Sequence, residues 1–226
     1  DQPRCGVVSR PRHNGGDAMN ALTLDDLLPL DEFAGRRREL FEAHRRYLDR
    51  YRRVRVGPAV TLVFTNRQTL WFQLQDVLRV ARLGEPAQIQ RELDLYNRLL
   101  PSNGRLQAAL LLDVDESRLT EELAPWRDLR GGDLRLCLGS QQMPANLLTC
   151  RPEDHAIGAA HWVQFVLDAA ARRLLADFHT AAHIAIMRPE YSHESGPLSE
   201  DVRQSLLEDL EASGRDGPQA RSASKG

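Results

Sequence analysis

The chain has 226 residues, 42% of them hydrophobic, and its 30 basic and 32 acidic side chains leave a net charge of −2. This is enough material for one domain with a substantial core, and the near-neutral charge argues against a nucleic-acid partner. Only one basic residue, Lys225, is a lysine, which excludes a Schiff base to pyridoxal phosphate and a P-loop for a nucleotide.

The number and spacing of the cysteines exclude further classes of protein. Cys5, Cys137 and Cys150 are widely separated and form no Cys-x-x-Cys, so a cysteine-ligated iron–sulfur cluster within the chain is excluded. An odd number of cysteines, no signal pattern and no long apolar span predict a cytoplasmic protein without a membrane segment. Cys137 lies in an apolar run, where a buried core residue is the simpler interpretation than a reactive thiol.

Both ends of the chain lack hydrophobic periodicity and are rich in Gly, Pro, Ser and Arg. Such composition cannot bury enough apolar surface to fold. We therefore expect a disordered extension over residues 1–18, a single folded domain over 19–210 and a disordered tail over 211–226.

The first half of that domain alternates helical and strand patterns. Thr23 can cap a short turn, and Asp31 can cap a long helix over 32–51 whose apolar residues recur at three- and four-residue steps. Two short β-branched runs, 54–56 and 60–64, predict a hairpin. Two further helices are expected over 69–83 and 87–100, separated by Gly84-Glu85-Pro86.

The second half is richer in strands. The pattern predicts strands over 106–114, 133–138, 159–167 and 183–187, and helices over 116–129, 169–177 and 199–210. Strands and helices are mixed rather than strictly alternating, which favours an α+β fold: one domain with a mostly antiparallel sheet and packed helices.

The helix over 69–83 carries the first candidate site. Gln73, Gln75, Asp76 and Arg79 stand among apolar residues, at spacings that let them meet on one helix face. If that face is buried, Asp76 is a candidate catalytic base, Arg79 a clamp for an anionic substrate group, and the two glutamines substrate-binding residues. The alternative is the solvated side of a half-exposed helix.

Histidines give a second candidate site. Five of the seven lie between positions 155 and 193, and His179 and His183 have the four-residue spacing of two metal ligands on a helix. With His161 and His193 they are the candidate metal ligands; the alternative is a set of unrelated surface and core histidines.

His44 and His161 each lie on an expected apolar face, where a hydrogen-bonded core histidine is the common case. His161 is nevertheless a candidate catalytic residue. If both histidines point into one cavity with Gln75 or Asp76, a functional site becomes the better interpretation.

Nine arginines occur between Arg36 and Arg55, with two tyrosines interleaved. On a basic protein this would suggest a nucleic-acid stripe. Acidic residues share the same helix, so a solvated arginine face is the ordinary interpretation.

Several motifs resemble a bacterial domain-of-unknown-function family, number three-five-zero-one. They are Arg53-Val54-x-Val56-Gly57-Pro58, Gln73-x-Gln75-Asp76-x-x-Arg79, Glu92-Leu93-Asp94-x-Tyr96-Asn97 and Pro189-x-Tyr191-x-His193. The chain departs from the pattern that we expect of this family at four positions. It carries Thr65, Asp76 and Ala81 where we expect Glu, and Arg188 where we expect His.

The resemblance implies a link to redox chemistry, because such proteins are often encoded beside rubrerythrin-like proteins and iron–sulfur oxidoreductase subunits. It leaves two functions open. One is an enzyme, assisted by a transition metal or haem, that acts on a small polar or anionic substrate, as in specialised biosynthesis in a high-GC bacterium. The other is an accessory protein that docks onto an iron–sulfur or ferritin-like redox partner.

Overall fold

A computed structural model describes residues 21–102, 104–126, 128–148 and 160–212 of the chain. The α-helices in these ranges are α1 (Leu30–Tyr51), α2 (Arg67–Val80), α3 (Pro86–Asn97), α4 (Leu119–Leu123), α5 (Ala169–Ala176) and α6 (Glu200–Ala212). The strands are β1 (Arg53–Val56), β2 (Val60–Phe64), β3 (Arg105–Leu112), β4 (Leu134–Leu138), β5 (Gln141–Leu147), β6 (Ala160–Val166), β7 (Ala182–Arg188) and β8 (Tyr191–Glu194). The predicted α+β class is confirmed. The extension over 1–18 and all but residues 211 and 212 of the tail lie outside the described residues.

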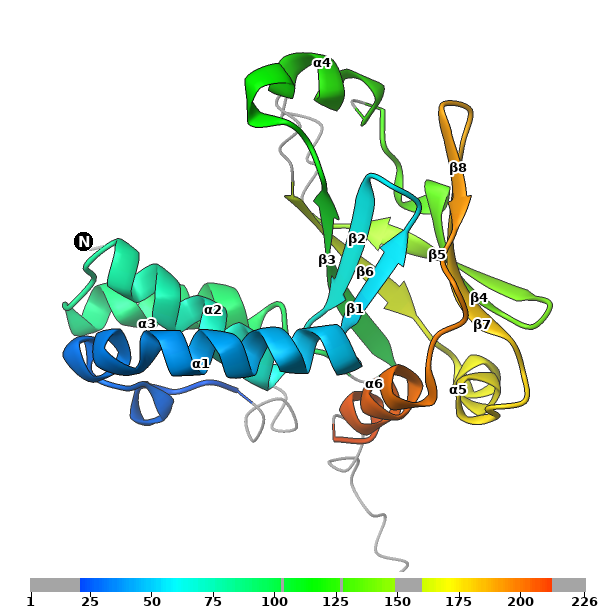
Figure 1. Ribbon diagram of the computed structural model, residues 1–226. Helices are drawn as coiled ribbons and strands as arrows, with labels where there is room; N and C mark the ends of the chain where they lie inside the picture. The colour runs from blue at the N-terminus through cyan, green and yellow to red at the C-terminus, as the bar shows by residue number, and fades with distance from the viewer. Residues whose placement is uncertain (1–20, 103, 127, 149–159, 213–226) are drawn as a thin grey trace, which may run out of the picture.

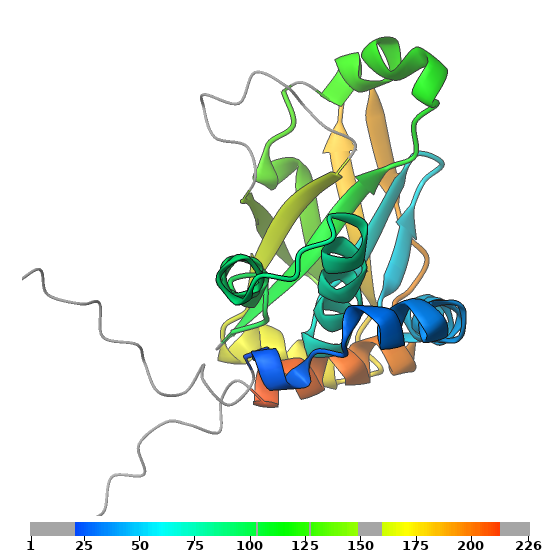
Figure 2. The same ribbon diagram turned by 90° about the vertical axis from the view of Figure 1, so that its left-hand side faces the viewer.

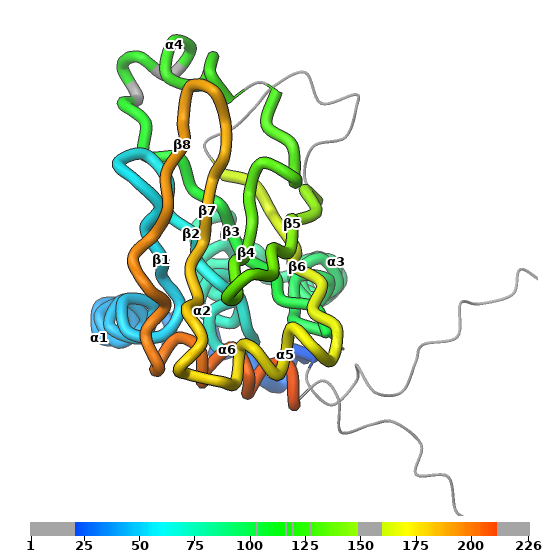
Figure 3. Tube along the Cα trace, turned by 90° about the vertical axis from the view of Figure 1, so that its right-hand side faces the viewer, coloured from blue at the N-terminus to red at the C-terminus, as the bar shows by residue number. Residues whose placement is uncertain are grey.

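The eight strands form one antiparallel sheet in the order β1-β2-β3-β6-β5-β4-β7-β8. The sheet curls until its two edge strands, β1 and β8, run side by side (Figure 3). A side chain joins them: the Tyr191 hydroxyl donates to the Val56 carbonyl at 2.6 Å and accepts from the Ala59 N–H at 3.0 Å. Gly57 is required here, because its φ is +67° and a Cβ would lie 2.5 Å from the Tyr191 hydroxyl. The sheet is therefore a nearly closed barrel.

The interior of this barrel is the main core. Inward residues of β3, such as Leu106 and Leu110, are at most 1% exposed and share one apolar cluster with Phe64 and Phe165. One end of the barrel is covered by α5 and α6, and the opposite end lies under the segment that contains α4 (Figure 1). Trp126, from that segment, belongs to the same core.

Three helices form a layer outside the barrel. Figures 1 and 2 show α1, α2 and α3 packed together on one side of the sheet. Phe33 of α1 packs against Phe72 of α2, with ring centroids 5.8 Å apart. A second apolar cluster joins α2 to α3, and Trp162 of β6 packs against it from the sheet. No helix among the described residues is both long enough and apolar enough to cross a lipid bilayer.

Two strands were not expected from the sequence. β5 has a single buried residue, Ala145, and contains Pro144, whereas β8 is Tyr-Ser-His-Glu and has none. β5 does alternate apolar with other residues over Met143, Ala145 and Leu147, but the Pro144 between them argues against a strand, and β8 has no such pattern.

Two helix expectations are corrected as well. The helix predicted over 116–129 is divided into α4 and two 3₁₀ turns, Glu116–Arg118 and Ala124–Trp126, the second of which contains Pro125. The long helix begins at Leu30 with Pro29 as its cap, rather than after Asp31.

The barrel seam yields the first prediction. Tyr191→Phe removes the hydroxyl that bonds two backbone groups across β8 and β1, so we expect the free energy of unfolding to fall by about 1–2 kcal/mol in urea denaturation. Tyr51→Phe, on α1, is the control and should change stability little. An equal effect of both substitutions would show that the seam does not depend on Tyr191.

Candidate functional site

The polar residues of α2 separate into two groups. Gln75 is fully buried, and its side-chain amide donates to the Leu28 carbonyl at 3.1 Å and accepts from the Leu28 N–H at 3.2 Å. Asn97 of α3 makes the same double contact with Leu22, at 2.9 and 2.8 Å. Both amides therefore act as structural clamps that hold the segment preceding α1 against α2 and α3. Gln75, expected to bind substrate, is committed to this contact.

Asp76 is the centre of an ion cluster between α1 and α2. Arg37 of α1 donates to both of its carboxylate oxygens, at 2.7 and 3.2 Å, and Arg79 donates to one of them at 2.9–3.0 Å. The hydrogen bond from Arg37 is the main cause that lowers the pKa of Asp76, and Arg79 acts in the same direction. Asp76 is therefore ionised, and its two oxygens neutralise only one of the two guanidinium charges.

Asp76 also lies on the wall of a groove between the helical layer and the sheet. The groove has a volume of about 620 Å³ and is lined mostly by apolar residues of α1, α2, β3 and β6. Gln73 lines it too, whereas neither Gln75 nor Arg79 does. Figure 2 looks onto the side of the molecule where α1, α2 and α3 lie in front of the sheet. The size of the groove and its few polar groups are typical of a small-molecule site.

His44 is a titratable group of the groove whose pKa differs strongly from its ordinary value. It is 9% exposed, and its ring stacks on Phe72 with centroids 4.3 Å apart and planes at 16°. Burial lowers the pKa of His44 from 6.5 to about 4, and the charge of Arg53 acts in the same direction. The imidazole is therefore neutral at pH 7, with one nitrogen that donates and one that accepts. Tyr96 lines the groove as well, and burial raises the pKa of its hydroxyl.

His161 also contributes to the groove wall, but the register of β6 determines where its side chain lies. It pairs with Leu110 of β3 and is two residues from Val163, and both of these belong to the barrel core. Alternate strand residues face opposite sides, so the His161 side chain faces the barrel interior and that of Trp162 faces the helical layer. The expected constellation of Asp76, Arg79 and His161 is thus divided by the sheet. His44, which the sequence assigned to the core, is the imidazole that shares the groove with Asp76.

The expected metal pair does not have its helical spacing. His179 lies in the turn after α5 and His183 on β7, where it faces Cys137 across the ladder. His193 lies on β8 and packs against Tyr191. Across the described ranges, no three His, Cys, Asp or Glu side chains come together to hold a metal ion. Cys137, expected to be buried, is 3% exposed, and burial raises the pKa of its thiol.

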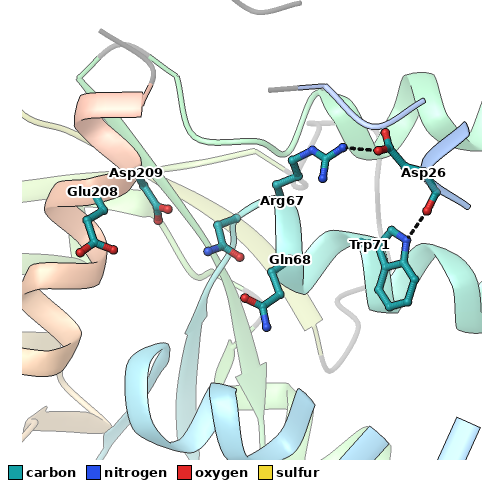
Figure 4. Close-up of a pocket in the computed structure, with 7 residues that line it drawn as sticks. Asp26, Arg67, Gln68, Trp71, Glu208 and Asp209 are labelled. Atoms are coloured by element: carbon teal, nitrogen blue, oxygen red, sulfur yellow. Dashed lines mark hydrogen bonds and ion pairs between the residues drawn. The ribbon is translucent and has the colours of Figure 1, made fainter. Parts of the chain in front are cut away.

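A second cavity of about 520 Å³ lies between α2, α6 and the 3₁₀ turn at Leu24–Asp26. Figure 4 shows that Asp26 contacts both Arg67 and Trp71 across this cavity. Arg67 pairs with Asp26 at 2.6 Å, and the Trp71 indole N–H donates to the Asp26 carbonyl at 2.8 Å. Asp209 is held by the buried Arg52. We therefore regard this cavity as a joint between elements and take the groove as the candidate site.

The arginine-rich segment of α1 and β1 is largely a solvated, ion-paired face, as expected. Arg38 pairs with Glu42 on α1, and Arg50 pairs with Asp201 on α6. Arg37 differs from its neighbours because it points to α2 and contacts the groove residue Asp76.

These features define an α+β domain with a nearly closed antiparallel barrel and a lateral groove under three helices. The chain belongs to the family described as "Protein of unknown function (DUF3501)", whose model matches residues 21–210. It is similar to a novel protein of unknown function from Burkholderia pseudomallei, with 26% identity and a TM-score of 0.76 over 84% of this chain and 99% of that one. No curated protein matches the chain.

The two glutamines of α2 form a matched pair for a test of the clamp. Gln75→Met preserves the length of the side chain but leaves the Leu28 N–H and carbonyl without the amide, so we expect a loss of about 2–3 kcal/mol in the free energy of unfolding. Gln73→Met, on the groove wall, should change it by less than about 0.5 kcal/mol. Equal losses measured by urea denaturation would contradict the assignment.

Burial of neutral His44 predicts acid sensitivity. Its pKa is 6.5 unfolded and about 4 folded, so below pH 6.5 the unfolded state binds the extra proton and stability falls as the pH falls. Across this window the loss is up to about 3 kcal/mol. His44→Phe should flatten stability between pH 6.5 and 4, as measured by urea denaturation, whereas His179→Phe, at an exposed turn, should not. If the free energy of unfolding of His44→Phe fell with pH as steeply as that of the wild type, burial of neutral His44 would not be the cause of the acid sensitivity.

Proposed function

We propose that this chain is an enzyme that acts on a small molecule held in the groove, with His44 as the group that exchanges a proton with it. The observation that carries the proposal is that His44 of α1 and Asp76 of α2 both line the same apolar groove. In such an apolar site the charged cluster can bind the substrate while the uncharged imidazole exchanges a proton with it. Binding and proton transfer are then carried out by different groups.

Each group has a distinct role in this proposal. The neutral imidazole of His44 can accept a proton, and an anionic ligand nearby would raise its pKa towards neutrality and make it a better base. Gln73 supplies an amide that can donate and accept on the same wall. The Asp76 cluster holds α1 against α2, so that the site is formed before the substrate binds.

A transition metal or haem stays a prediction. A neutral imidazole such as that of His44 can be a ligand of haem iron, and the apolar lining of the groove around it is compatible with a porphyrin. Both predictions can be tested on protein purified without a metal column: an absorbance spectrum would detect haem, and elemental analysis would detect a transition metal. Location in the cytoplasm is likewise our proposal, based on the three widely separated cysteines.

The accessory-protein alternative is favoured by one observation: the groove rim exposes apolar side chains. Phe41, Val77 and Val80 are 43%, 37% and 67% exposed. A redox partner that covers them would bury this surface. Capture of an iron–sulfur or ferritin-like protein by the wild type, lost in Val80→Asp, would support this alternative.

The enzyme proposal predicts turnover that depends on His44. Incubated with a bacterial small-molecule extract, the wild type should deplete one compound and form another, as followed by mass spectrometry. His44→Gln should slow this reaction by about 100-fold or more, because the amide cannot take up the proton. His193→Gln, at an exposed position on β8, is the matched control and should retain the rate.

Binding of an extract compound without its conversion would contradict catalysis and leave a binding module. An undiminished rate in folded His44→Gln would remove His44 from the chemistry. Circular dichroism of both variants establishes that they are folded.

A further inference from the structure

We infer that the ligand of the groove is a flat, apolar molecule with one anionic group, and that Arg37 and Arg79 bind this anion. The inference rests on the proposed function, because the site is the same, and it adds the chemical class of the ligand. It depends on the charge of the rim, the position of that charge beside the apolar wall, and the rings that line the groove.

The charge at the α1–α2 edge is not balanced. Arg37 and Arg79 each have Asp76 as their ion-pair partner among the described residues, so two guanidinium groups share one carboxylate. The cluster keeps a net charge of +1, and each guanidinium has five N–H donors, of which Asp76 accepts two. The arginine side chains are 37% and 32% exposed, so the remaining donors are accessible to a carboxylate, sulfonate or phosphate.

Neither arginine lines the groove itself, but both are bonded to Asp76, which does, and Arg37 lies beside the apolar wall. The Arg37 guanidinium carbon is 5.7 Å from the centroid of the Phe41 ring, and Phe41 lines the groove. On the α3 edge the nearby charge is negative, because Glu92 acts on Tyr96. An anionic ligand would therefore place its charged group at the α1–α2 edge and its apolar body towards β3 and β6.

The lining favours a flat molecule. Six of the fifteen residues that form the groove carry rings: Phe41, His44, Phe72, Tyr96, His161 and Trp162. Because His161 contributes from the other side of β6, five of these rings belong to the groove side. Aromatic side chains gain stacking and edge contacts with planar ligands beyond the area they bury. The volume of about 620 Å³ accommodates a molecule of two or three fused or linked rings.

Two fluorescent probes that differ by one group test this. Anilinonaphthalene sulfonate is a flat apolar anion, and N-phenylnaphthylamine is the same ring system without the sulfonate. In fluorescence titrations of the full chain, we expect the anion to bind about 10-fold more tightly than the neutral probe. Arg79→Gln and Arg37→Gln should each remove most of that preference, and Arg79→Gln, which leaves the α1–α2 ion pair intact, should not change the affinity for the neutral probe.

Arg38→Gln is the matched control, because Arg38 follows Arg37 on α1 but is 94% exposed and pairs with Glu42. Its preference for the anion should equal that of the wild type. Ala160→Trp, which fills the groove from β6, should weaken the binding of both probes and so locate them.

Equal affinity for the two probes, or an anion preference that survives both arginine substitutions, would overturn the ligand class. Binding that is unaffected by Ala160→Trp would place the probes elsewhere and overturn it too. These results are distinguishable from failure of the proposed function, which is decided by turnover in the His44→Gln variant.

Discussion

The buried ion pair between Arg52 and Asp209 joins the parts of the molecule that create the groove. Arg52 is the residue between α1 and β1, is 2% exposed, and also donates to the Ser205 hydroxyl at 2.6 Å and the Tyr47 hydroxyl at 3.1 Å. A guanidinium at this depth is tolerated only because these partners, with Asp209, satisfy it. The pair therefore holds the C-terminal end of α1 to α6, which covers one end of the barrel, and α1 in turn carries three residues of the groove wall, Phe41, His44 and Leu48.

The alternation of side chains along β6 then divides the molecule into two compartments. His161, Val163 and Phe165 face the barrel interior, whereas Trp162 meets the helical layer. The interior is filled by its own apolar side chains, and so the space for a ligand lies on the outer side, where the helices leave the sheet incompletely covered. A one-residue shift in this strand would exchange the two faces, which is why an isolated histidine in an apolar run cannot be assigned from its neighbours alone.

Much of the fold follows from the sequence because it rests on local patterns. The apolar stripe of α1, the β1–β2 hairpin and the continuous run of β3 are each visible within a few residues. β5 was missed because Pro144 lies within its short apolar alternation, and β8 because its pairing, not its side chains, defines it.

The site was predicted less well because its partners are distant in sequence. Gln73 and Gln75 are the same residue type, two positions apart on one helix. What makes Gln75 a clamp is its hydrogen bonds to Leu28, which is distant in the sequence. Arg37 was missed although a signal existed. It stands four residues after Phe33 and four before Phe41, on the apolar stripe rather than on the solvated face.

The pairing of two arginines with Asp76 distinguishes a binding role from a purely structural one. Arg37 alone suffices to neutralise Asp76 and to join α1 to α2, because Arg79 lies on the same helix as Asp76, and Gln75 and Asn97 show that elsewhere the helical layer is joined by neutral amides. The second guanidinium on this carboxylate, that of Arg79, adds like-charge repulsion that the fold does not need. Arg37 stands at the edge of the apolar groove beside Phe41 and within reach of solvent. Residues that are unfavourable for the fold persist where function requires them, and the second guanidinium on Asp76 is such a residue at the edge of the groove.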